Sequence, residues 1–284
     1  MPSLLDIRRR IRSVKNTQQL TKAMKTVSAA KLRRSQERVF SARPYADQLK
    51  KVLANLTRRV EEISHPLLEV RPEQRVLFIV VTADRGLCGA FNSNITRTAM
   101  GFIREHSGQQ IQIVAVGRKG RDFFRRRGIP IRAEFVNIFS RLDYGTAKDI
   151  AEAVSQAYAD GEVDAVYMLY NEFKSVIQQR IVVEKVLPLS RIETETSQPQ
   201  TDYIFEQPPQ EIFNRMLPRY VEIQIYRALL ESAAAEHGAR MASMDTASRN
   251  AGEMIDSLTL NMNRIRQAAI TREIIEVVSG AGAL

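Results

Sequence analysis

Hydrophobic positions in the last part of the chain follow a seven-residue repeat. After Pro218 there is no further proline, and only Gly238 and Gly252 interrupt the run up to Ser279. Such a repeat keeps one stripe of a helix against a partner helix through a left-handed supercoil, so it predicts a long coiled-coil helix. The stripe alternates steps of four and three residues over ten positions: His237, Met241, Met244, Ser248, Ala251, Ile255, Leu258, Met262, Ile265 and Ala269.

The ends and the composition of this helix add to its interpretation. Pro208, Pro209 and Glu211 suit a first turn, because proline fits there and a carboxylate complements the positive end of the helix dipole. Gly280 is a typical helix end. The stripe is rich in small residues and methionine, which bury little apolar area per heptad. We therefore expect other protein to surround this helix.

A second helical pattern opens the chain. Ser3 and Asp6 form a capping box, and no glycine or proline occurs from there to Arg43. We expect Pro44 to kink or restart the helix, which then resumes over 45–63. The apolar positions that should face a partner fall in steps of three and four: Leu4, Ile7, Ile11, Val14, then Leu20, Met24 and Val27.

Between these segments the period changes. Continuous apolar runs predict strands, and longer amphipathic stretches between them predict helices, which together indicate a sheet covered on both faces. We expect strands at 76–82, 111–116, 131–138, 164–170 and 176–187, with a turn at 171–175. Helices are expected at 91–106, 118–127 and 144–158.

The predicted fold is therefore α/β, with two parts. The N- and C-terminal helices form a long antiparallel coiled coil, and the middle forms a Rossmann-like α/β domain with a parallel or mixed sheet. The expected boundaries are 1–66 for the N-terminal coiled-coil helix, 70–190 for the α/β domain, 191–208 for a linker, and 209–284 for the C-terminal helix that pairs with 1–66.

Charge is concentrated at one end of the chain. The net charge is +10, but residues 1–60 contain sixteen Lys or Arg against three Asp or Glu, a net of +13, which leaves −3 for the remainder. This segment predicts an acidic partner: a protein surface, a nucleic acid or an anionic membrane. The single Cys88 excludes an internal disulfide and favours a reducing compartment. No apolar run approaches a membrane span, so we expect a soluble or peripheral protein.

Candidate catalytic chemistry is sparse. The loop at 82–89 follows a strand and precedes a helix, where phosphate-binding loops occur, but it holds only Gly86-x-x-Gly89 and is better interpreted as a structural turn. The three histidines show no metal-ligand spacing. We expect no cofactor and no catalytic residues. A basic coiled-coil nucleic-acid-binding protein remains the alternative, and a nucleotide-binding enzyme comes third.

Three segments carry a family resemblance. They are IRRRIRSVKNTQQLTKAMKTVSAAKLRRSQ at 7–36, DRGLCGAFN at 84–92 and RQAAITREIIEVVSGA at 266–281. They resemble the γ subunit of the bacterial F-type ATP synthase, and the resemblance covers the whole chain. It implies a non-catalytic rotor stalk that couples proton-driven rotation to ATP synthesis or hydrolysis at the catalytic β subunits. Its coiled coil would stand inside a ring of α and β subunits.

The resemblance also implies contacts. The α/β domain would meet the ε subunit and the c-ring, with no nucleic acid involved. Positions that match the family's contact with β are Met24, Lys25, Arg266, Gln267, Thr271 and Glu273. Positions that match its contact with the c-ring or ε are Tyr203, Phe205 and Glu206.

Some features limit or refine this comparison. The family often has a lysine after the methionine that matches Met244, whereas Asp245 stands here. A charge contact near 245–249 is therefore in question. The cysteine-bearing insertion of chloroplast members is missing, and the chain starts directly on its first helix. These features predict a bacterial protein at the cytoplasmic face of the inner membrane, held there through the complex.

Overall fold

The computed structural model describes residues 4–59, 65–175, 178–189 and 208–281. Their Cα positions divide into two compact units, one formed by the described parts of 1–29 and 240–284, the other by those of 30–239. Ser3 of the expected capping box and most of the expected linker lie outside the described residues. Both long helices run from one unit into the other, so the domain boundaries expected from the sequence stay a prediction.

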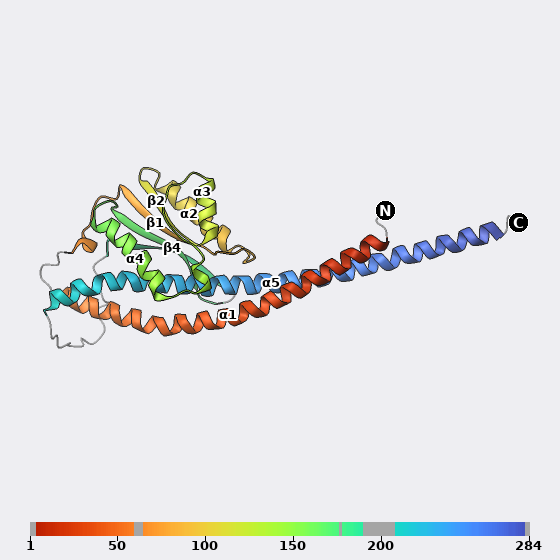
Figure 1. The fold of residues 1–284 in the computed structure, drawn as a ribbon, viewed down its shortest axis with the longest axis horizontal. Coiled ribbons are helices and arrows are strands. Elements are labelled where there is room, and N and C mark those ends of the chain that lie inside the picture. Colours follow the sequence, from red (N-terminus) through yellow and green to blue (C-terminus); the bar gives the residue numbers. More distant parts are fainter. Residues whose placement is uncertain (1–3, 60–64, 176–177, 190–207, 282–284) are drawn as a thin grey trace. The chain divides into compact units, whose positions relative to one another are not determined.

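One long helix lies near each end of the chain (Figure 1). Helix α1 spans Leu4–Arg59 and helix α5 spans Pro209–Ala281, which confirms two expected elements. Pro44 lies inside α1, so the helix neither stops nor restarts there. Gly280 lies inside α5, one residue before its end.

The unit 30–239 contains a five-stranded sheet in the order β3-β2-β1-β4-β5. The first four strands are parallel, and β5 runs antiparallel to β4, so the sheet is mixed. The strands are β1 Arg75–Val81, β2 Gln110–Val116, β3 Ile131–Phe135, β4 Ala165–Phe173 and β5 Gln179–Leu187. The expected turn at 171–175 was wrong over its first three residues, because these pair with β5 and extend β4.

Helices cover both faces of this sheet, as Figure 1 shows. On one face lie α2 (Phe91–Glu105) and α3 (Arg118–Arg126), whose buried side chains join a core with Phe78, Val80 and Leu169. The other face carries α4 (Tyr144–Ala159) and the long helices. Short 3-10 turns occur at Pro66–Leu68 and Ile138–Ser140.

One buried carboxylate ties the start of β1 to the start of β4. Asp164 is 4% exposed and accepts hydrogen bonds from the backbone N–H of Arg75 at 2.8 Å and from its Nη2 at 2.7 Å. The guanidinium of Arg75 holds the pKa of Asp164 below its ordinary value of 3.8. The charged form is therefore favoured by the fold.

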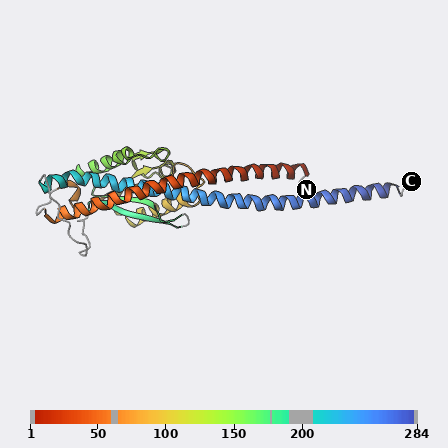
Figure 2. The same cartoon turned by 90° about the horizontal axis from the view of Figure 1, so that it is seen from below.

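Within the same unit the long helices lie side by side, as Figures 1 and 2 both show. In α1 the buried residues recur through Leu32, Val39, Leu49 and Leu53. In α5 a much broader surface is buried between Phe213 and Ala235. A helix buried nearly all round belongs to a core, so this part of α5 lies between α1 and the α/β layers.

In the other unit, the pairing of 4–29 with 240–281 confirms the C-terminal stripe. Met244, Ser248 and Ala251 are buried. The N-terminal stripe was partly wrong: Leu20 and Val27 are 65% and 55% exposed, and the buried positions are Thr21 and Ser28, which are 8% and 3% exposed. The reason is geometric, because steps of three and four from Val14 lead through Gln18 to Thr21 and Ser28.

Candidate functional site

The far end of α5 carries the polar positions expected to meet a partner. Arg266, Gln267, Thr271 and Glu273 are all exposed. Thr271 Oγ1 donates to the carbonyl of Gln267 at 3.0 Å, so these two share one face. The structure thus presents the four polar side chains to solvent on one stretch of helix.

Exposed apolar side chains, which were not expected from the sequence, lie beside them and towards the end of α5. Ile274 is 57% exposed and Val277 is 71% exposed, and Ile270, Ile275 and Val278 are exposed as well. Exposed apolar groups gathered on one element mark an interaction surface. The signal was present in the sequence, because the run Ile274-Ile275-Glu276-Val277-Val278 exceeds what one seam of a helix pair can bury.

Met24 and Lys25 lie on α1 in the same unit. Met24 is half-buried, and Lys25 Nζ donates to Asp245 Oδ1 at 2.6 Å. Lys25 holds the pKa of Asp245 below its ordinary value, with a smaller effect from Arg249. Asp245, where the chain departs from the family pattern, therefore forms an ion pair across the two helices. Tyr203, Phe205 and Glu206 lie outside the described residues.

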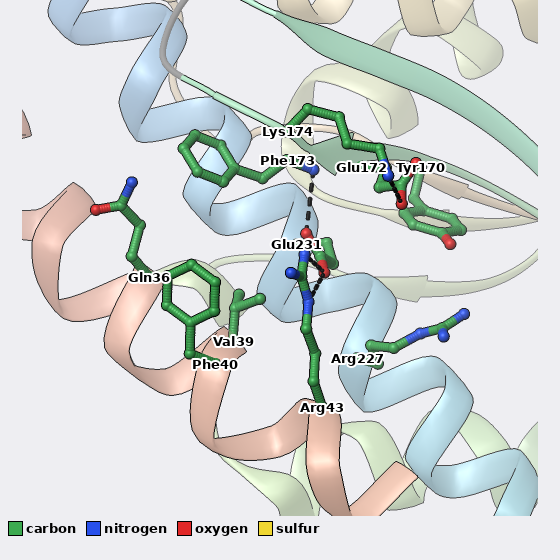
Figure 3. A pocket seen from close by; sticks show the side chains of 10 residues that line it. All are labelled: Gln36, Val39, Phe40, Arg43, Tyr170, Glu172, Phe173, Lys174, Arg227 and Glu231. Carbon is green, nitrogen blue, oxygen red and sulfur yellow. Dashed lines mark hydrogen bonds and ion pairs between the residues drawn. The ribbon is translucent and has the colours of Figure 1, made fainter. Parts of the chain in front are cut away.

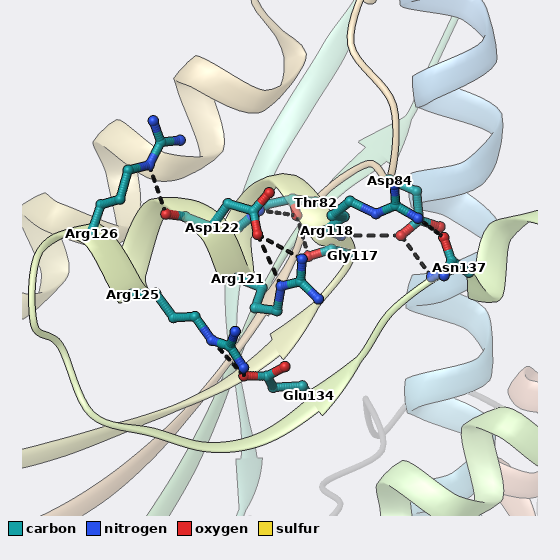
Figure 4. A network of polar contacts seen from close by, with 11 residues as sticks. Thr82, Asp84, Gly117, Arg118, Arg121, Asp122, Arg125, Arg126, Glu134 and Asn137 are labelled. Carbon is teal, nitrogen blue, oxygen red and sulfur yellow. Dashed lines mark hydrogen bonds and ion pairs between the residues drawn. The ribbon is translucent and has the colours of Figure 1, made fainter.

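The loop after β1 is built as a structural junction (Figure 4). Thr82 Oγ1 donates to the carbonyl of Val116 at 3.0 Å and accepts from the N–H of Gly120 at 2.8 Å. Asp84 Oδ1 accepts from the backbone N–H of Arg118 at 3.0 Å and of Asn137 at 2.8 Å. A carboxylate of the loop thus accepts a backbone N–H at the start of α3 and another after β3, and so connects the loop to both.

The described residues do not form a metal site: among them no group of three or more His, Cys, Asp or Glu side chains is placed to hold a metal ion. In the same part of the chain, each helix is too short or too polar to cross a bilayer. His237 is buried on the coiled-coil stripe, as the sequence suggested for a packed histidine.

A polar joint that the sequence analysis missed lies between α1, α5 and β4 (Figure 3). Arg43 and the backbone N–H of Phe173 both donate to the carboxylate of Glu231. A signal was available, because an acidic residue inside the apolar run 228–235 must either break the helix packing or find a buried partner.

Comparisons with known proteins agree with this architecture. The family model described as ATP synthase matches residues 3–284. The "ATP synthase gamma chain" of Solibacter usitatus is 54% identical and is matched over 100% of this chain and 99% of its own length. The protein of the same name from Pelotomaculum thermopropionicum is 52% identical, with 100% of both chains covered.

Solved structures give the same result. A chain from the central stalk and c-ring of the Tetrahymena thermophila mitochondrial ATP synthase matches with a TM-score of 0.62 and 28% identity, over 81% of this chain and 99% of that one. A chain of the Euglena gracilis mitochondrial ATP synthase has a TM-score of 0.70 at 16% identity, over 99% and 94%, which supports the fold. The chain belongs to the ATP synthase gamma chain family, whose members form the central stalk of that enzyme.

Proposed function

We propose that this chain is the rotating central stalk of a bacterial F-type ATP synthase, without catalytic residues of its own. It couples proton-driven rotation to ATP synthesis or hydrolysis at the catalytic β subunits. The observation that carries the proposal is the exposed end of α5, where polar and apolar side chains alternate around a helix. A surface of this kind is costly in water and suits a partner that surrounds the helix.

The polar members of this surface suit a contact that changes during rotation. Arg266 offers five donors, and Glu273 accepts hydrogen bonds, so each can bond different partner groups in turn. The apolar members Ile274 and Val277 contribute area without requiring one orientation. We therefore assign Arg266, Gln267, Thr271 and Glu273 to a contact with β.

Exposed side chains of α1 support a second contact with β. Lys22 and Arg34 are exposed, as are Leu20 and Val27. Exposed cations and exposed apolar side chains on one helix suit a partner surface that is acidic and partly apolar. Lys25 forms an ion pair with Asp245, so an acidic partner would have to compete with Asp245 for Lys25.

The remaining partners follow from the family. We assign the ε subunit and the c-ring to the segment of Tyr203, Phe205 and Glu206 and to the α/β domain apart from the exposed face of α4. The protein would then lie at the cytoplasmic face of the inner membrane, peripheral to it and held through the complex. The domain division 1–66, 70–190, 191–208 and 209–284 belongs to the same proposal.

The test replaces the four polar residues at the end of α5 by alanine. Alanine is the best helix former, so the helix itself should persist. We expect assembled complexes to form, with ATP hydrolysis and synthesis reduced several-fold. The matched control changes four exposed polar residues of α4 to alanine, and wild-type rates are expected there: Lys148, Asp149, Glu152 and Gln156.

The comparison is made on complexes of verified subunit stoichiometry. Reduced rates in the α5 variant alone support the contact with β. Wild-type rates in a fully assembled α5 variant would show that this end of the helix is merely solvated, and would remove the residue assignment.

A further inference from the structure

Glu231 of α5 is an ionisable group held inside the unit 30–239. The residue is 3% exposed, and its two carboxylate oxygens have different partners. Oε1 accepts from Arg43 Nη2 at 2.7 Å and from Arg43 Nε at 3.1 Å, which attaches α5 to α1. Oε2 accepts from the backbone N–H of Phe173 at 3.1 Å, which attaches α5 to the last residue of β4.

The bonds of the Glu231 carboxylate require a defined geometry of their partners. A buried carboxylate is unfavourable unless a cation and hydrogen-bond donors lie close to it. Arg43 meets that need through two donors on one side of its guanidinium, which fixes the direction of the pair. The guanidinium carbon of Arg43 also lies 5.4 Å from the centre of the Phe40 ring, one turn earlier on α1. The pair therefore holds both side chains in one position.

The joint lies beside an open cleft of about 320 Å³, lined by residues of α1, β4 and α5 that include Val39, Phe40 and Lys174. Figure 3 shows Arg43 of α1 and Glu231 of α5 pointing toward each other. The polar bonds therefore add a directional connection to the apolar contacts that bury α5 here.

We propose that Glu231 is a positioning residue for rotation, the joint through which the α/β domain and the paired helices turn as one body. The inference rests on the proposed rotor function. In a rotor, torque is applied at the α/β domain and transmitted along the helices. Any movement of the domain relative to the helices would therefore reduce the work that is transmitted. A directional, buried bond resists sliding better than apolar contact, because apolar contact has no preferred orientation.

Glu231 shares this task with neighbouring contacts. Gln179 Nε2 of β5 donates to the carbonyl of Ala235 at 2.8 Å, and Arg227 of α5 contacts Glu184 of β5 at 3.5 Å. These attach α5 to the edge strand, whereas Glu231 also includes α1. Loss of Glu231 should therefore loosen the joint without dissociating the domain.

The experiment uses the assembled complex, reconstituted in vesicles with the wild-type chain or a variant. Glu231→Leu removes all three bonds and replaces the carboxylate by an apolar side chain of similar length. Glu231→Gln removes the charge but keeps an oxygen that can accept a hydrogen bond. Arg43→Lys keeps the charge and loses the two-donor geometry. Its side chain is 38% exposed, so this variant should fold even if Glu231→Leu does not. The control is Glu152→Gln on the exposed face of α4.

Two quantities are measured: protons pumped per ATP hydrolysed, and the exchange rate of the Phe173 amide proton. For Glu231→Leu we expect a partial loss of pumping per ATP, while hydrolysis continues. The Phe173 amide should exchange about tenfold faster or more, because its acceptor is gone. Glu231→Gln and Arg43→Lys should fall between wild type and Glu231→Leu, and Glu152→Gln should match wild type.

The outcomes separate the two proposals. A wild-type complex that hydrolyses ATP without pumping would overturn the rotor function itself. If the wild type pumps and all three joint variants keep its pumping per ATP, Glu231 is not a torque-bearing contact. Loss of assembly or thermal stability with unchanged pumping per ATP would give the same negative answer, since it shows a role in folding alone.

Discussion

Gly117→Ala is the substitution whose cost can be worked most directly from the structure. Gly117 lies between β2 and α3 at φ 91° and ψ 143°, a region that only glycine adopts readily. A Cβ there would lie 2.1 Å from the carbonyl oxygen of Thr82 and 2.7 Å from its carbon. Both are backbone atoms, so no side-chain rotation relieves the overlap.

The magnitude follows from two contributions. The backbone conformation costs about 1–3 kcal/mol for a residue with a Cβ. Making room costs about 1–3 kcal/mol more, because Thr82 N–H donates to the carbonyl of Val116 and must move with it. We therefore expect the α/β domain to lose about 2–6 kcal/mol, a large part of a typical domain stability of about 5–15 kcal/mol.

The matched control is Gly101→Ala in α2. A Cβ at Gly101 meets no heavy atom within 4 Å, and alanine is the better helix former by about 1 kcal/mol. Hydrogen exchange of the β1 and β2 amides measures both effects as local free energies of opening. The reasoning is refuted if Gly117→Ala changes that free energy by less than about 0.5 kcal/mol, the range of an ordinary surface substitution.

Further predictions concern charge and local stability. Asp164→Asn should lower the free energy of opening of β1 by about 2 kcal/mol at pH 7, since it removes a charged acceptor. Because the folded pKa of Asp164 lies below 3.8, this stabilisation is present above that pH and is lost as the pH falls through the folded value, so exchange measured down a pH series should show wild type and variant converging. Reversing Lys22 and Arg34 to Glu should weaken ATP-driven pumping at low salt more than at high salt, and equal pumping at both would remove the acidic-partner hypothesis. In the isolated chain, amides of 213–235 should exchange slowly and those of 270–281 fast, and uniform slow exchange would contradict the exposed end of α5.

The elements that the sequence predicted well are those set by local pattern. The run from Val76 to Val81 is apolar at every position and becomes a strand buried on both faces. The ten-position stripe in α5 keeps its phase, because the seven-residue repeat fixes which side of a helix can meet a partner. Gly86 and Gly89 lie in the loop between β1 and α2, where Gly89 takes a positive φ of 57°.

Features that depend on distant residues could not be predicted in the same way. Leu20 and Val27 look like seam residues by hydrophobicity, yet Thr21 and Ser28 occupy the seam because phase decides burial there. The pair of Lys25 with Asp245 joins residues 220 positions apart. Glu231 is one acidic residue among many until the fold brings Arg43 and β4 beside it.

The most direct test of the central claim is ATP-driven rotation of this chain inside its complex. The ring of α and β subunits is fixed to a surface, and a probe is attached to the exposed face of α4, away from the assigned contacts. We expect one copy of the chain per three α and three β subunits, and stepwise rotation of the probe in one direction when ATP is added. A fully assembled complex that hydrolyses ATP at the normal rate while the probe stays still would contradict the account.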